Sequence, residues 1–151
     1  MRYYRNISGL MHVPAQMAYT AHGQDQLTRA FAPVAALTAT VNALAPGSRV
    51  LYPFESPTGA TLHGRPIYTS WYAAARSLQF QGIANADRAA AFIADQRPDF
   101  VIVNQTDTGP TSIPNGLIRE YVASQGRLVD QVGPYKLYHV SGFPEPHAPI
   151  K

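Results

Sequence analysis

Two short apolar runs, Arg49–Phe54 and Asp99–Asn104, restrict how this chain can fold. Each run is apolar almost throughout, as expected for a strand that is covered on both faces. Between them lies a helical pattern that the side chain of Asn85 can cap and that Pro98 ends. A strand, a helix and a second strand in this order predict a parallel sheet that lies between layers of helices.

Proline and glycine positions divide the remaining helical patterns. From Asp25 onward apolar residues recur at helical spacing, but Pro33 lies inside the pattern and would destabilise a continuous helix by about 3 kcal/mol. We therefore expect one helix that ends near Ala32 and a second that carries Pro33 in its first turn. A further helix opens at Pro114, and Gly126 is expected to close it as a left-handed glycine.

The end of the chain predicts a hairpin, because Leu128–Val132 and Tyr135–Val140 are strand-like and join at Gly133 and Pro134. The expected fold is a small three-layer α/β sandwich with a mainly parallel central sheet and an antiparallel carboxyl-terminal hairpin. The expected organisation is an irregular lead-in over residues 1–24, a single α/β domain over residues 25–141 and a proline-rich tail over residues 142–151.

Composition excludes several classes of protein. A length of 151 residues corresponds to one domain, and only 14% of the residues are charged. The net charge of +3 comes mostly from scattered arginines, with Lys136 and Lys151 as the only lysines, so we expect no nucleic-acid partner. The absence of cysteine excludes disulfide and zinc–thiolate chemistry. Because no apolar stretch approaches 18 residues, we expect no segment that spans a bilayer.

The densest group of functional side chains lies within residues 63–72. Arg65 stands there beside the aromatic side chains of Tyr68, Trp71 and Tyr72. An aromatic face with a neighbouring arginine is typical of carbohydrate and lipid-headgroup sites, so these residues are candidates for substrate binding. The alternative is that the aromatic rings cover the sheet while Arg65 is solvated.

Two acidic residues, Glu55 and Asp107, follow the carboxyl ends of the predicted strands, where an open α/β sheet places its ligands. We include Asp107 among the candidate binding residues, although such an acid more often caps a loop. The loop Gly109–Pro114 enters the amino terminus of a helix and is the candidate site for a small anion. Prolines in this loop remove amide donors, which weakens that interpretation.

Signatures of catalysis and cofactor binding are missing. The sequence has no glycine-rich dinucleotide or nucleoside-triphosphate motif and no nucleophile elbow. Its histidines show no metal-binding spacing, and His139 lies in an apolar strand where a packed imidazole is expected. We therefore assign no catalytic residue, no metal ligand and no cofactor.

Taken together, several segments resemble one family: the bacterial membrane glycosyltransferases that use polyprenyl-phosphate sugars, relatives of protein mannosyltransferases and aminoarabinose transferases. The resemblance covers most of residues 24–141. It is carried by a helical lead from Gln24 to Val41 and by four short motifs. The motifs are Asn42–Leu51, His63–Tyr68, Ala89–Asn104 and Gly133–Val140.

The resemblance implies a soluble carboxyl-terminal domain on the extracytoplasmic face of the bacterial membrane, in the periplasm or outside the cell. Its partner would be the transmembrane part of its own parent chain, which carries the catalytic acids of this family. The domain would cover the mouth of the active site or bind a glycan or lipid-linked acceptor. Two alternatives stay open: a freestanding α/β module that binds a small anion at Gly109–Pro114, and a purely structural domain.

Overall fold

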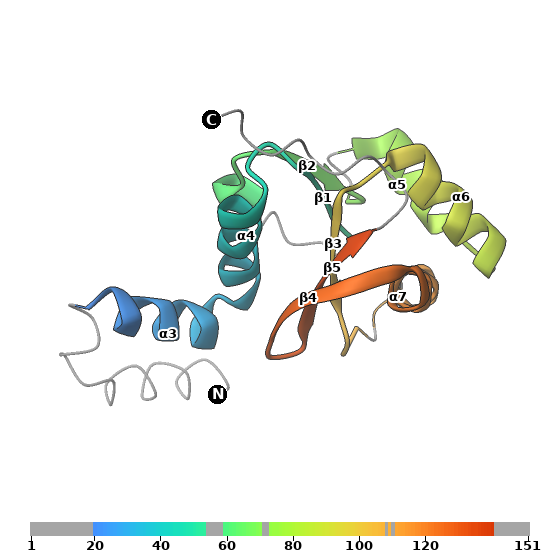
Figure 1. The fold of residues 1–151 in the computed structure, drawn as a ribbon. Coiled ribbons are helices and arrows are strands. Elements are labelled where there is room, and N and C mark those ends of the chain that lie inside the picture. The colour runs from blue at the N-terminus through green and yellow to red at the C-terminus, as the bar shows by residue number, and fades with distance from the viewer. Residues whose placement is uncertain (1–19, 54–58, 71–72, 108, 110, 141–151) are drawn as a thin grey trace.

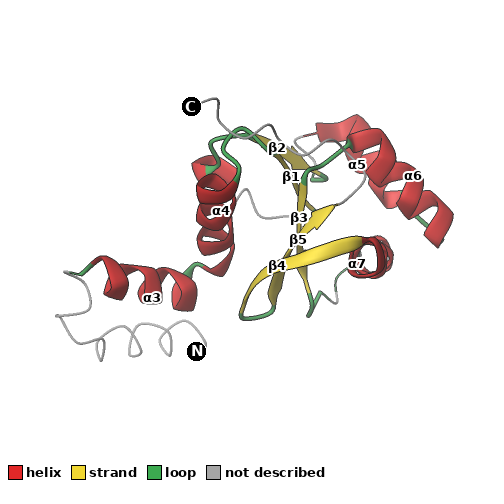
Figure 2. Ribbon diagram, viewed as in Figure 1, coloured by secondary structure: helices red, strands yellow, loops and turns green. Residues whose placement is uncertain are grey.

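The computed structural model describes residues 20–53, 59–70, 73–107, 109 and 111–140. These residues form helices on both sides of one twisted sheet (Figures 1 and 2). The helices are α3 (Ala21–Phe31), α4 (Pro33–Leu44), α5 (Ala74–Gln81), α6 (Ala86–Gln96) and α7 (Ser112–Gln125), and Gly59–Thr61 form one turn of 3-10 helix. The strands are β1 (Arg49–Tyr52), β2 (Arg65–Tyr68), β3 (Phe100–Asn104), β4 (Gly126–Val132) and β5 (Tyr135–Val140).

The sheet has a parallel half and an antiparallel half. Its five strands lie in the order β2-β1-β3-β5-β4. β1 runs parallel to both β2 and β3, whereas β5 runs antiparallel to both β3 and β4. The two halves meet where β3 pairs with β5, the last described strand of the chain. The predicted α/β fold, with its parallel centre and carboxyl-terminal hairpin, is confirmed.

Each face of the sheet buries its own apolar cluster. On one face α4 packs through Leu37 and Val41 against residues such as Val50 and Leu137, all fully buried. On the other face α5, α6 and α7 cover a second cluster that includes Ile118. Figure 2 shows α4 on one side of the strands and α5, α6 and α7 on the other, which is the three-layer arrangement. Among the described residues, no helix is long and apolar enough to cross a membrane.

Asp99 lies directly before β3 and forms hydrogen bonds to the strands on both sides, β1 and β5. Its carboxylate accepts a hydrogen bond of 2.7 Å from the amide of Arg49, and its own amide donates to the Arg49 carbonyl at 2.9 Å. The Asp99 carbonyl accepts a bond of 3.0 Å from the amide of Val140. One residue therefore fixes where β1, β3 and β5 begin or end relative to one another.

Several predicted boundaries are confirmed, and others differ from the structure. The helical pattern does break at Ala32, and the side chain of Asn85 caps α6 as expected. However, α3 begins at Ala21, within the expected irregular lead-in, because Thr20 caps it by accepting from the amide of Gly23 at 3.0 Å.

Gly126 is not a left-handed glycine. Its backbone is extended, with φ −98° and ψ 168°, and it begins β4 directly at the end of α7. A Cβ atom here would lie 2.7 Å from the carbonyl oxygen of Val122 and 3.0 Å from that of His139. Glycine is therefore required at this position for close approach of two backbones rather than for a positive φ.

An irregularity in β4 turns Asp130 toward the α4 face of the sheet. Leu128 pairs with Tyr138, but Asp130 pairs with Leu137, one position short of regular register. Such a bulge reverses the face that the following side chains occupy. Asp130 thus shares the face of α4 and accepts hydrogen bonds from Arg29 of α3 at 3.2 Å and from Thr40 of α4 at 3.1 Å.

We expect this contact to make the stability of the domain depend on pH. Burial alone raises the pKa of Asp130, but bonds from Arg29, from the Gln131 amide and from Thr40, together with the charge of Arg29, lower it overall. A lowered pKa means that the stabilisation is present above the ordinary pKa of an aspartate, about 3.9, and is lost as pH falls through the native value. Because Arg29 is 38% exposed, the ion pair contributes about 0.5–1 kcal/mol at most.

Asp130→Asn should therefore lower the free energy of unfolding at pH 7 by about that amount. Urea titrations of both proteins between pH 7 and pH 3 measure the difference, which should shrink toward the acid end. A difference that stays constant over this range would show that the carboxylate charge is not its cause.

Candidate functional site

The carboxyl ends of the three parallel strands define one edge of the sheet. β1 ends at Tyr52, β2 at Tyr68 and β3 at Asn104, and all three point the same way because the strands are parallel. In open α/β sheets this edge is where ligands bind. Of the candidate residues, Tyr68 and Asp107 lie at this edge. Tyr68 ends β2, whereas Asp107 lies in the loop that follows β3, and β1 lies between these two strands.

Arg65 lies at the opposite edge. It begins β2, where it is paired with Arg49 at the beginning of β1, and its side chain is exposed. The three residues between Arg65 and the end of β2 span about 10 Å along the strand. Arg65 and Tyr68 therefore lie at opposite ends of β2.

Trp71 and Tyr72 lie outside the described residues, as does Glu55. Of the three aromatic candidates for substrate binding, only Tyr68 lies within the described part of the chain. The Tyr68 ring packs against Tyr52, with 5.8 Å between ring centroids and 30° between ring planes. Its side chain is half-buried, so part of the ring covers the end of β1 as the structural alternative predicts.

Tyr52 is the buried member of this aromatic pair. Its hydroxyl lies 3.0 Å from the hydroxyl of Thr38 in α4, and both residues are fully buried. Burial raises the pKa of Tyr52 above its ordinary value. A tyrosine with a raised pKa stays neutral at physiological pH, so Tyr52 serves packing and hydrogen bonding here.

Asp107 organises the loop between β3 and α7. One carboxylate oxygen accepts a hydrogen bond of 3.1 Å from the amide of Gly109, and the other accepts from the side-chain amide of Asn115. Asn115 is buried in the first turns of α7. Asp107 therefore places a negative charge beside the amino terminus of this helix, where such a charge is stabilising.

This placement bears on the anion site expected at Gly109–Pro114. Of its residues, Pro110 lies outside the described part of the chain. The amide of Gly109 already donates to Asp107, so it is not available to a phosphate. A second anion would also approach the carboxylate of Asp107 and be repelled by it. The loop therefore uses the Gly109 amide in its own hydrogen bonding rather than offering it to an anion.

The histidine that the sequence places in a strand is packed. The His139 ring meets Phe100 edge-on, with 5.1 Å between the ring centroids. Within the described ranges, no group of three or more His, Asp or Glu side chains is arranged to hold a metal ion.

A pocket that the sequence did not indicate lies between α5 and α6. It has a volume of about 260 Å³, and Arg88, Phe92 and Asp95 of α6 contribute to its walls. In the sequence, Arg88 and Asp95 have the spacing of an ordinary solvated helix face, so no signal distinguished them.

Comparisons of the chain with protein-family models, with curated proteins and with solved structures found no match.

Proposed function

We propose that this chain is an accessory extracytoplasmic domain of a bacterial membrane glycosyltransferase. The parent protein transfers a sugar from an isoprenoid-phosphate carrier, and its membrane-embedded part supplies the catalytic groups. The domain itself covers the active-site mouth and contacts the acceptor.

The observation that carries the proposal is where the resembling motifs lie in the fold. The motifs end on β1, β2, β3 and β5, and these are four neighbouring strands of the sheet. Segments that are up to about ninety residues apart in sequence thus form one continuous structural unit.

The glycine of the second motif has a structural reason of the same kind. Gly64 lies directly against the backbone of Ser48, and a Cβ atom would overlap the Ser48 carbonyl oxygen. That oxygen accepts a hydrogen bond of 2.9 Å from the amide of Arg65. The motifs therefore support a shared fold more than a shared reaction. A shared fold fits an accessory role.

Acceptor contact is proposed at the carboxyl edge of the parallel strands. Tyr68 offers a half-buried ring and Asp107 a half-buried carboxylate there, whereas Arg65 lies at the other edge. A carboxylate accepts hydrogen bonds from sugar hydroxyls, and an aromatic ring covers their apolar face. Tyr68 and Asp107 thus form the smallest set of described residues suited to a glycan.

Purified by itself, the chain is expected to show no turnover of a polyprenyl-phosphate sugar, with or without acceptor. The full-length parent, encoded by the same reading frame, is expected to be active. Turnover by the chain alone would contradict the proposal. So would a reading frame that encodes these residues without a membrane-embedded portion.

In the full-length parent, Asp107→Asn should raise the KM for acceptor about 5-fold with little change in kcat. A hydrogen bond to a charged group is stronger than a neutral one by roughly 1 kcal/mol, and its loss affects acceptor binding uniformly. Steady-state kinetics with varied acceptor measure the effect, and circular dichroism checks folding.

Arg65→Ala, a change at the opposite edge, is the matched control and should leave KM within about 2-fold. If Arg65→Ala raised KM and Asp107→Asn did not, acceptor contact at the carboxyl edge would be wrong. If neither variant changed KM, the domain would be purely structural.

A further inference from the structure

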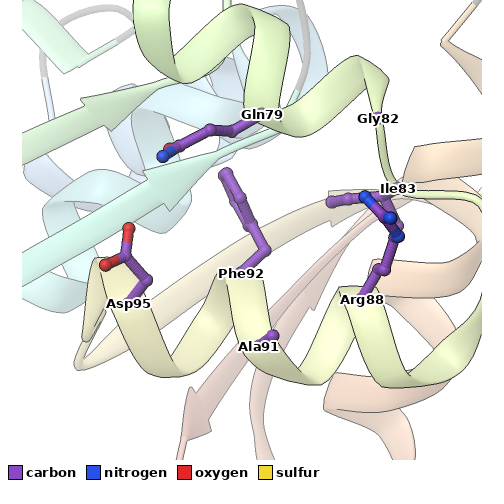
Figure 3. A pocket seen from close by; sticks show the side chains of 7 residues that line it. All are labelled: Gln79, Gly82, Ile83, Arg88, Ala91, Phe92 and Asp95. Carbon is purple, nitrogen blue, oxygen red and sulfur yellow. The ribbon is translucent and has the colours of Figure 1, made fainter.

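The pocket between α5 and α6 is open to the surface and charged at both ends. Figure 3 shows Arg88, Phe92 and Asp95 projecting from α6 toward α5, with Phe92 between the two charges. Gln79 and Gly82 of α5 form the opposite wall. Gly82 contributes only backbone atoms to this wall of the 260 Å³ space.

Arg29 and Asp130 form an ion pair, but Arg88 and Asp95 form none within the described part of the chain. The Arg88 guanidinium makes no hydrogen bond or ion pair with any described residue, whereas the backbone amide of Arg88 donates to the side chain of Asn85 at 2.9 Å. The Asp95 carboxylate accepts one hydrogen bond of 2.7 Å from the side chain of Gln96. A cation and an anion thus lie seven residues apart on α6, which is about two helical turns or 10 Å.

An exposed apolar side chain lies on α5, the helix that contributes Gln79 to the pocket. Leu78 is 71% exposed, the largest exposed fraction among the described large hydrophobic residues. It lies one helical turn before Gly82 on α5. On α6, the small side chain of Ala91 is exposed between the levels of Arg88 and Asp95, so another helix can approach closely there.

We propose that this surface, formed by Leu78, Gly82, Arg88, Ala91 and Asp95, binds a second copy of the chain across a two-fold axis. The two α6 helices run antiparallel and cross near Ala91. Arg88 of each copy then faces Asp95 of the other, and Leu78 of each copy covers the partner copy's pocket beside Phe92.

The opposite charges of Arg88 and Asp95 on one exposed helix favour a second copy as the occupant. A two-fold interface is self-complementary, so each residue that contacts another residue is contacted by it in return. In an antiparallel second copy of α6, Asp95 lies opposite Arg88 of the first copy and Arg88 lies opposite Asp95. The two charges are about 10 Å apart in each copy. The interface is small, so we expect a dissociation constant of about 100 µM, within the weak class of associations.

Sedimentation equilibrium of the full chain from about 10 µM to 1 mM tests the dimer. The mass should rise from 16.4 kDa toward twice that value over this range. Arg88→Glu and Asp95→Arg should each weaken association at least about 10-fold, because each change replaces two attractions by two repulsions. The combined charge reversal R88E/D95R should restore the wild-type constant to within about 3-fold. Leu78→Ser should weaken association about 10-fold by removing the apolar contact.

Arg127→Glu, which reverses an exposed charge on β4, is the matched control and should leave association unchanged. Circular dichroism verifies that each variant is folded. A chain that remains a monomer at 1 mM overturns the proposal. A dimer that persists in Arg88→Glu, or single reversals that the double reversal does not rescue, overturns the proposed pairing. None of these outcomes depends on the proposed transferase role.

Discussion

Gly64→Ala is expected to lower the free energy of unfolding by about 3 kcal/mol. The added Cβ would overlap the carbonyl oxygen of Ser48 and lie 2.9 Å from the amide nitrogen of the same residue. These are backbone atoms and cannot rotate away as the end of a side chain can. To relieve the overlap, β2 must move from β1 and lose the bond between the Arg65 amide and Ser48. Urea unfolding followed by circular dichroism measures the loss.

Gly116→Ala provides the control for this substitution. Gly116 lies inside α7, and the nearest atom to an added Cβ is the far end of Arg119, at 3.7 Å. Because glycine destabilises a helix interior relative to alanine, this variant should gain about 0.5–1 kcal/mol. Equal effects at the two glycines would contradict the argument, and so would a loss at Gly64 below about 0.5 kcal/mol.

Leu37→Ala should cost a similar amount, about 3 kcal/mol, because it removes a fully buried side chain from the face of the sheet that α4 covers. Leu44→Ala changes the same residue type in the same helix, but Leu44 is 61% exposed, so its cost should stay below about 0.5 kcal/mol. Thermal and urea unfolding of the two variants compare buried and exposed positions of one helix directly.

Ile118→Ala extends this prediction to the opposite face. Ile118 is also fully buried, but in the cluster that α7 covers. Because the sheet separates Leu37 from Ile118, the two losses should add within about 0.5 kcal/mol in the double variant, and a single unfolding transition should remain. Separate transitions for the two clusters would contradict a single cooperative three-layer domain.

Local signals predicted the elements well where the chain itself supplies the cause. Pro33 cannot continue the preceding helix, and Asn85 caps the following one with its own side chain, so both boundaries follow from adjacent residues. The hairpin at Gly133 is of the same kind, because its φ of 57° favours glycine.

Features that depend on distant residues were not predictable. Gly126 is constrained by the carbonyl oxygens of Val122 and His139, and the second of these comes from another strand. The bulge before Asp130 depends on the register with Leu137, so the sequence of β4 alone does not indicate which face the aspartate occupies. A one-residue slip changes that face completely.

The positions of the candidate site residues could be predicted only where they depend on neighbouring residues in the sequence. Asp107 was expected at the carboxyl edge because it directly follows a strand, and it lies there. Arg65 and Tyr68 are close in sequence, which suggested one group of binding residues. They are the first and last residues of β2, however, and therefore lie at opposite ends of that strand. The pocket at Arg88 lies between two consecutive helices, α5 and α6, and the sequence of either helix alone does not indicate it.

The position of β5 has a consequence for how the protein forms during synthesis. β3 lies in the middle of the sheet, yet one of its two neighbours is the strand that leaves the ribosome last among those described. At about 5–20 residues per second, the 36 residues from Asn104 to Val140 take roughly 2 to 7 s to be translated. Throughout that interval the apolar edge of β3 is without its partner, and nascent chains are most exposed to mispairing with one another at this stage.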